Sequence, residues 1–258
     1  MVEGLPAAGK TTLARAMQQQ FGSRHCAVEF FREETCQPVD LFRQAVFFPG
    51  EYAELLRLPE AAPLAEMLAQ NTRRLGPYFV TAYLQLPFSE NAAALRQLFR
   101  SHDIGDGRAS FETYRYLHLL LWEQFVAEYG STSSVIITEG VMLQNQLLDL
   151  VGFYELPEAA LLRYFRELFD ILRPLKPKLH YIYLKNIETT LLHALQERGT
   201  DEGSWGCGFE TWLAQTPYGK RKHLCGVSGM LSCCLTLQAL SLSILECSDL
   251  DCEIIERD

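Results

Sequence analysis

Basic residues are scarce in this chain of 258 residues, which has 23 Lys and Arg against 32 Asp and Glu and a formal net charge of −9. A surface that coats nucleic acid normally needs an excess of basic side chains. The composition therefore argues against a nucleic-acid-binding protein. A nucleotide site stays compatible with it, because such a site needs only a few local cations and oriented backbone amides.

The sequence also has no evident membrane-spanning segment or secretory signal. No apolar run approaches the roughly 20 residues that a membrane-spanning helix needs. The amino terminus has no basic region followed by an apolar stretch, so it does not resemble a secretory signal. We therefore expect no membrane association and a cytoplasmic location.

The eight cysteines form no Cys-x-x-Cys pair. Without a secretory context they are expected to be reduced thiols that pack as small apolar side chains, and a zinc site is the alternative. Internal repeats and low-complexity tracts are missing as well. The chain is long enough to bury a full hydrophobic core, as one large domain or as a domain with an insertion.

One motif in the chain is specific. Residues 4–11 read Gly-Leu-Pro-Ala-Ala-Gly-Lys-Thr, which matches the phosphate-binding pattern G-x-x-x-x-G-K-[ST]. In that pattern the glycines let backbone N–H groups point at phosphate, and the next helix directs its positive end at the anion. Lys10 would reach the β- and γ-phosphates of ATP, and the Thr11 hydroxyl would bind Mg²⁺. The predicted nucleotide-binding residues are Gly4, Leu5, Pro6, Ala7, Ala8, Gly9, Lys10, Thr11 and Thr12.

The surrounding pattern predicts an α/β fold, a parallel sheet flanked by helices. Expected strands alternate with expected helices: strands at 26–31, 134–139, 179–184 and 252–256, and helices at 9–21, 157–172, 186–198 and 230–246. The first and last strands are expected to be shortened by the chain ends. Residues 38–130 are expected to form a mainly helical insertion on the acceptor side, in which Ser110 caps a helix.

Acidic residues follow two of the expected strands. Glu139 ends the run Val-Ile-Ile-Thr, and a P-loop site needs an acid there to hold Mg²⁺ or to orient the nucleophile. Glu33 and Glu34 follow the earlier strand, and either of them could accept the proton of an acceptor hydroxyl as a general base. The alternative for each is a solvated carboxylate at the end of a strand.

A candidate lid spans residues 199–222. Four glycines lie between positions 199 and 208, and Arg198 and the cluster Lys220, Arg221 and Lys222 flank the segment. A cation that a closing lid delivers would stabilise the transferring phosphoryl group, so Arg198 is a candidate catalytic residue. The alternative is a solvated helix end.

The chain resembles two groups of proteins at these motifs. Its opening, together with Phe31-Arg32-Glu33 and the 179–198 region, is similar to thymidylate kinases and related nucleoside and nucleotide kinases. Over most of its length, in segments such as residues 37–41, Gly107-Arg108 with Ser110, residues 143–145 and residues 217–220, it resembles an uncharacterised bacterial family of kinase-like P-loop NTPases. Two departures from the thymidylate kinases argue against thymidylate as substrate: Pro6 and Ala7 stand where an acid is expected, and Gly140 follows Glu139 in place of arginine.

These features predict an ATP- and Mg²⁺-dependent phosphotransferase that acts on a small-molecule acceptor, such as a nucleoside, a nucleotide or an antibiotic-like alcohol. Its catalytic residues would be Lys10, Glu33, Glu139 and Arg198, and its metal ligands Thr11 and Glu139. A phosphate acceptor would need no base and would require cations within residues 38–130 instead. A nucleotide-binding regulatory ATPase without such an acceptor is the main alternative, and a shortened, inactive copy is another.

Overall fold

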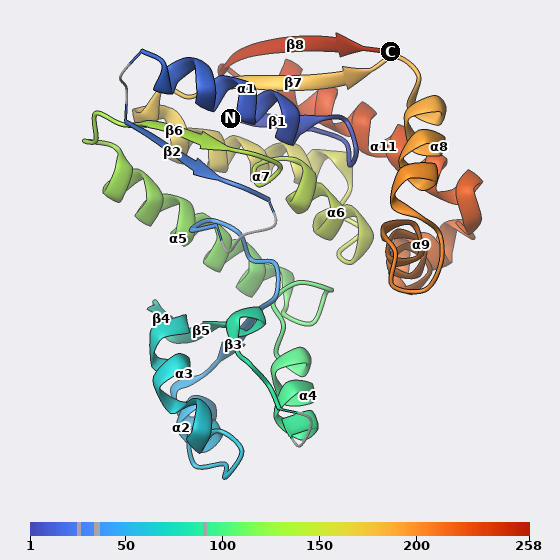
Figure 1. Ribbon diagram of the computed structural model, residues 1–258. Coiled ribbons are helices and arrows are strands. Elements are labelled where there is room, and N and C mark those ends of the chain that lie inside the picture. The colour runs from blue at the N-terminus through green and yellow to red at the C-terminus, as the bar shows by residue number, and fades with distance from the viewer. Residues whose placement is uncertain (25–26, 34–36, 90–91) are drawn as a thin grey trace. The chain divides into compact units, whose positions relative to one another are not determined.

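The computed structural model describes residues 1–24, 27–33, 37–89 and 92–258 (Figure 1). The chain forms two compact units, of which unit 1 comprises Met1–Gln37 and Glu123–Asp258 and unit 2 comprises Pro38–Trp122. Unit 2 falls within the insertion that the sequence predicts over residues 38–130. The inserted segment is therefore a compact unit of its own, and the two units are described separately.

Parallel strands form the centre of unit 1. They are β1 (Val2–Gly4), β2 (Val28–Phe31), β6 (Val135–Thr138), β7 (Lys178–Leu184) and β8 (Asp251–Arg257). β7 pairs with β1 on one side and β8 on the other, and β2 pairs with β6. A parallel bridge between Val2 and Glu139 joins the two sets, and the Gly140 N–H donates to the Val2 carbonyl at 3.0 Å. The order across unit 1 is thus β2-β6-β1-β7-β8, which confirms the predicted parallel α/β sheet.

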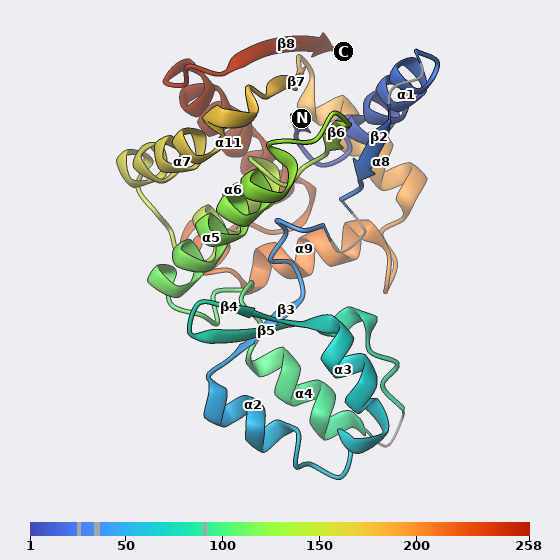
Figure 2. The same ribbon diagram turned by 90° about the vertical axis from the view of Figure 1, so that its left-hand side faces the viewer.

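Helices cover both faces of these strands. Unit 1 contains α1 (Lys10–Gly22), α6 (Gln144–Gly152), α7 (Glu158–Leu172), α8 (Ile187–Arg198), α9 (Trp205–Gln215), α10 (Pro217–Lys222) and α11 (Gly226–Glu246). Figures 1 and 2 show α1 on one face and α7 and α11 on the other. The Asn186 side chain accepts a hydrogen bond from the Thr189 N–H at 3.0 Å, so it caps α8 as the sequence predicts.

All seven residues of β8 pair with the seven residues of β7. One prediction about the carboxyl-terminal part is wrong. No apolar run was expected to approach a membrane-spanning length, but within the described residues one helix, α11, passes that test of length and composition. A core helix of a globular protein passes the same test, and α11 buries one side, which includes Met230, Cys233 and Leu237. Its buried Gln238 side chain bonds both the N–H and the carbonyl of Leu184.

The segment predicted as a lid is mostly helical. Trp205 begins α9, so Gly206 and Gly208 lie in a helix and not in a loop. The Ser204 side chain caps α9 by accepting from the Cys207 N–H, and the Thr216 side chain caps α10 by accepting from the Gly219 N–H. The number of glycines favoured a flexible loop, so the two capped helices were not predicted. Gly206 and Gly219 are buried where an added Cβ would meet the backbone, so close packing is the role of these two glycines.

Unit 2 contains a sheet that the sequence analysis missed. Its strands are β3 (Gln44–Phe47), β4 (Thr72–Leu75) and β5 (Tyr78–Ala82), which pair antiparallel in the order β3-β5-β4. The segment still contains more helical than strand residues, so the three strands add to the predicted helices rather than replace them. The aromatic and β-branched residues of β5 favour a strand, and the positive φ of Gly76 (56°) allows the tight turn between β4 and β5.

Four helices complete unit 2. They are α2 (Pro49–Leu55), α3 (Ala65–Asn71), α4 (Ala93–Ser101) and the first part of α5 (Phe111–Tyr129), with short 3₁₀ turns at Ala62–Leu64 and Tyr83–Gln85. Figure 2 shows α2, α3 and α4 on one side of the sheet. Phe47, Leu68 and Phe99 are fully buried in the core of this unit. Ser110 caps α5 by accepting a hydrogen bond from the Thr113 N–H at 3.2 Å, as predicted.

Candidate functional site

The loop between β1 and α1 curls tightly at the carboxyl end of the middle strand. Gly4, Ala7 and Gly9 all have positive φ angles, of 149°, 64° and 88°. A Cβ on Gly4 would lie 2.9 Å from the Ile182 carbonyl of β7, so glycine is required where the loop leaves the sheet. Gly9 occupies the N-cap of α1, where no side chain bonds the first N–H groups of the helix. Such N–H groups and the positive end of the helix dipole are suited to bind an anion.

Lys10 is the cation of this loop, and it is buried. Its ammonium group donates to the Leu5 carbonyl at 3.2 Å and to the Gln144 side-chain oxygen. It also forms an ion pair with Glu33 at 3.4 Å. Gln144 bonds both partners, because its amide nitrogen donates to the other Glu33 oxygen. Lys10 is therefore held over the loop by groups from three different parts of the chain.

Glu139 and Thr11 lie next to this lysine. The Thr11 hydroxyl donates to Oε1 of Glu139 at 3.2 Å, and the Glu33 backbone N–H donates to the same oxygen at 3.2 Å. Glu139 is buried, and among the described residues no group bonds its second oxygen, Oε2. A buried carboxylate oxygen without a partner is costly. A cation at this oxygen would remove that cost.

The donor set fits Mg²⁺ better than a softer metal. A hydroxyl and a carboxylate are hard oxygen ligands, and Mg²⁺ usually takes one or two protein ligands and completes its shell with phosphate and water. Within the described residues no cluster of three or more His, Cys, Asp or Glu side chains could hold a metal by itself. Thr11 and Glu139 could thus hold a magnesium ion only together with ligands from a phosphate group or water.

Glu3, on β1, holds the backbone at the start of α6 next to the site. It is fully buried in β1, and its two oxygens accept hydrogen bonds from the N–H groups of Met142 and Gln144 at 2.8 and 3.1 Å. Burial raises the pKa of the Glu3 carboxyl to about 7, and the hydrogen bonds oppose the rise. These bonds fix the start of α6. Glu3 therefore positions the Gln144 side chain that joins Lys10 to Glu33.

Sequence reasoning missed two residues of the site. One is Gln144, and the other is Arg257, whose guanidinium donates to the Ala8 carbonyl at 3.4 Å. A Cβ on Gly9 would lie 2.1 Å from the same guanidinium group, so Arg257 lies directly against the loop. Its position at the carboxyl end of β8 could have identified it, because ligands of parallel sheets bind at that end of the strands.

The remaining predicted residues are not brought together with Lys10. The guanidinium of Arg198 lies over the Trp205 ring, 5.4 Å from its centroid, in the described part of unit 1. Arg221 forms an ion pair with Glu155. Thr12 is exposed on α1. Glu34, the alternative to Glu33 as a base, lies outside the described residues.

Comparisons of the chain with protein-family models, with curated proteins and with solved structures found no match. The function proposed below therefore rests on the geometry of the loop and of the residues around Lys10 and Glu139.

Proposed function

We propose that unit 1 is a P-loop phosphotransferase, which binds Mg²⁺ and ATP at residues 4–12 and transfers the γ-phosphoryl group to a small-molecule acceptor. The observation that carries the proposal is the buried Glu139 carboxylate, with one oxygen bonded by Thr11 and the other without a partner among the described residues. The Glu139 carboxylate lies beside the start of α1, the helix that follows the phosphate-loop motif. The Gly9 N-cap offers no side chain to bond the first N–H groups of this helix. These features together suit a metal-bound polyphosphate.

The phosphate groups would be bound by the loop and by Lys10. The backbone N–H groups of residues 9–11 and the positive end of α1 favour a polyphosphate over a neutral ligand. A charge-assisted bond from an ammonium group to phosphate is about twice as strong as a neutral hydrogen bond. Arg257 adds a second cation beside the loop. Lys10 and Arg257 would therefore oppose the negative charge of a bound triphosphate.

Thr11 and Glu139 are the residues that would hold magnesium. A bound Mg²⁺ ion neutralises charge on the β- and γ-phosphate oxygens. Glu139 is held in place by the Glu33 N–H and by the Gln37 side chain, which donates to the Glu139 carbonyl at 3.3 Å. Groups from outside its own strand thus position the Glu139 carboxylate. Metal ligands are usually oriented by such additional hydrogen bonds.

Glu33 is the residue best placed to act on an acceptor hydroxyl. It pairs with Lys10, and it is partly exposed, with 32% of the side chain accessible. A phosphate group that binds Lys10 competes with this ion pair. Glu33 is then available to accept a hydrogen bond or a proton from an acceptor alcohol.

The proposal predicts acceptor-dependent consumption of ATP. In the presence of Mg²⁺ we expect one class of compound, in a panel of nucleosides, nucleotides, sugars and aminoglycosides, to increase ADP release by at least tenfold. For a hydroxyl acceptor, Glu33→Gln should lower this stimulated rate by about 10²-fold, the typical contribution of general base catalysis. The measurement is a coupled ADP assay with product identification by mass spectrometry.

Glu29→Gln is the matched control, because Glu29 is exposed on β2, the strand that precedes Glu33, and its substitution should leave the rate unchanged. Slow ATP hydrolysis that no acceptor stimulates would overturn the phosphotransferase and support the regulatory ATPase. Failure to bind nucleotide would overturn both.

A further inference from the structure

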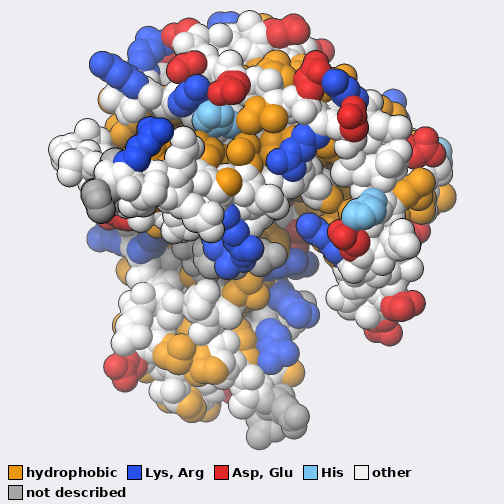
Figure 3. Space-filling view, turned by 45° about the horizontal axis from the view of Figure 1, so that its top comes forward, with side chains coloured by type: hydrophobic (Ala, Val, Ile, Leu, Met, Phe, Trp, Pro, Cys, Tyr) orange, Lys and Arg blue, Asp and Glu red, His pale blue; other side chains and the backbone are white. Residues whose placement is uncertain are grey.

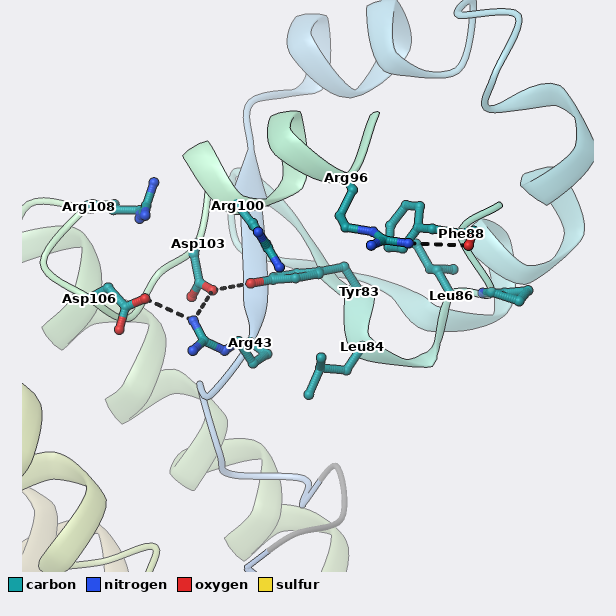
Figure 4. Close-up of a pocket in the computed structure, with 11 residues that line it drawn as sticks. Arg43, Tyr83, Leu84, Leu86, Phe88, Arg96, Arg100, Asp103, Asp106 and Arg108 are labelled. Carbon is teal, nitrogen blue, oxygen red and sulfur yellow. Dashed lines mark hydrogen bonds and ion pairs between the residues drawn. The ribbon is translucent and has the colours of Figure 1, made fainter. Parts of the chain in front are cut away.

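Unit 2 contains a cavity of about 600 Å³, within the size range of small-molecule sites. Its lining combines four arginines, two aspartates and a group of apolar side chains (Figure 4). The lining residues are Arg43, Tyr83, Leu84, Leu86, Pro87, Phe88, Arg96, Arg100, Asp103, Asp106 and Arg108. All of them belong to unit 2, so the cavity is a property of that unit alone.

A polar network of Arg43, Tyr83, Asp103 and Asp106, in which Tyr83 and Asp103 are buried, forms one wall of the cavity. Arg43 forms ion pairs with Asp106 at 2.8 Å and with Asp103 at 3.4 Å, and the Tyr83 hydroxyl donates to Asp103. Asp103 is only 2% exposed, and its other oxygen accepts from the Gly105 N–H at 3.0 Å. The charge of Arg43 is therefore already balanced by two carboxylates. This network makes a fixed wall and leaves anion binding to the other three arginines.

The other three arginines of the lining are Arg96, Arg100 and Arg108. Within the described residues, which exclude 90–91, none of the three forms an ion pair. Arg96 and Arg100 lie one turn apart on α4, where like charges repel each other. Figure 4 shows both leaving the helix toward the side on which Tyr83 and Phe88 lie. Figure 3 shows basic side chains close together along one edge of unit 2, and these are arginines because residues 38–122 contain no lysine.

An apolar surface lies beside these arginines. Leu84 is 59% exposed although it lines the cavity, and the lining also includes Pro87, Phe88 and the largely buried Leu86. The guanidinium of Arg96 lies over the Phe88 ring, 5.6 Å from its centroid, and donates to the Phe88 carbonyl at 3.3 Å. Arg96 is thus held at the junction of the charged and the apolar surfaces. A ligand with an anionic head and an apolar body would contact both.

We propose that this cavity binds an organic phosphate monoester, with the phosphate on Arg96, Arg100 and Arg108 and its apolar or aromatic body against Leu84, Leu86 and Phe88. A phosphate monoester carries close to two negative charges at neutral pH and offers three acceptor oxygens. Guanidinium groups match that geometry with paired N–H donors. A monocarboxylate would leave more of the positive charge unbalanced. The proposal shares no residue with the ATP site and does not depend on it.

The test is calorimetric titration of the whole chain with phenyl phosphate at low ionic strength. We expect saturable binding, and we expect benzoate, inorganic phosphate and benzyl alcohol each to bind at least tenfold more weakly. Arg100→Ala should weaken phenyl phosphate binding by roughly tenfold, and the double variant Arg96→Ala with Arg100→Ala by more, because each loses charge-assisted hydrogen bonds. Raising the salt concentration should weaken binding further.

Arg57→Ala is the matched control, since Arg57 is an exposed arginine of unit 2 outside the cavity lining. Lys10→Ala is the second control and should leave phenyl phosphate binding unchanged. Equal affinity in the wild type and Arg100→Ala would overturn the proposal. Loss of binding in Lys10→Ala would assign the probe to the nucleotide loop instead, and benzoate binding as tight as phenyl phosphate would contradict the assignment to phosphate. Arg96 and Arg100 are exposed, so unchanged thermal unfolding of the variants is expected and checks that they fold.

Discussion

Glu139→Gln should reduce Mg²⁺-dependent ATP turnover on the order of 10²-fold, while nucleotide binding in EDTA stays within about twofold of the wild type. The substitution keeps the shape of the side chain and one oxygen for the bond from Thr11. It removes the negative charge and replaces one carboxylate oxygen by an N–H donor, which repels a cation. The loss should therefore appear as weaker Mg²⁺ dependence. The measurement is turnover over a titration of Mg²⁺.

Glu29→Gln again provides the comparison, as a carboxylate of similar length on an exposed part of unit 1. Identical Mg²⁺ titrations for Glu139→Gln and the wild type would remove Glu139 from the metal site. Loss of nucleotide binding in EDTA would instead show that the substitution disturbs the loop itself, through the bonds that Glu139 makes to Thr11 and to the Glu33 N–H.

Glu3 should make unit 1 less stable as the pH rises from about 4.5 to about 7. Its folded pKa is raised by burial from 4.5 to about 7. Within that range the unfolded chain releases the proton and the folded chain keeps it, so the unfolded state binds fewer protons and the free energy of unfolding falls with pH. A shift of roughly 2.5 units, at about 1.4 kcal/mol each, makes the effect on the order of 3 kcal/mol.

The measurement is urea unfolding of the wild type and of Glu3→Gln at several pH values, followed by fluorescence of Trp205 and Trp212. Gln has a single acceptor oxygen for the two N–H donors, Met142 and Gln144, so the variant should be less stable at low pH. The difference between the two proteins should then shift in favour of the variant by about 3 kcal/mol between pH 4.5 and 7. A difference that does not change with pH would show that Glu3 does not titrate in this range.

The sequence predicted the parallel strands of unit 1 and the neighbourhood of Lys10, Thr11, Glu33 and Glu139. It could do so because carboxyl ends of parallel strands share one edge, so residues that follow separate strands become neighbours. The side-chain geometry confirms that they are neighbours. Their roles in ATP binding and catalysis remain predictions.

The contacts of Gln144 and Arg257 could not be predicted from local pattern, although the position of Arg257 after an expected strand could have marked it as a candidate. Gln144 meets Lys10 across 134 residues, and Arg257 meets Ala8 across 249 residues. Neither belongs to a motif of fixed spacing. Their positions depend on the register of β7 with β8 and on the hydrogen bonds between Glu3 and the start of α6, which local propensity does not contain.

The sheet within residues 38–130 and the helices within residues 199–222 were missed for a common reason. Glycine and proline were interpreted as breaks or flexible points, whereas Gly76 forms the hairpin turn of unit 2 and Gly206 and Gly219 pack inside helices. A glycine that permits close packing and a glycine that permits motion look the same in a sequence. Burial, which depends on the whole fold, distinguishes them.

Binding of ATP by residues 4–12 is tested most directly by equilibrium binding of a non-hydrolysable ATP analogue to the wild type and to Lys10→Ala in the presence of Mg²⁺. We expect Lys10→Ala to bind at least about tenfold more weakly, because a charge-assisted contact worth about 1.5–3 kcal/mol is lost. Lys178→Ala is the control and should bind like the wild type, because Lys178 lies at the amino-terminal end of β7, whereas the loop lies at the carboxyl ends of the strands. Equal affinity of the wild type and a folded Lys10→Ala would contradict binding at these residues.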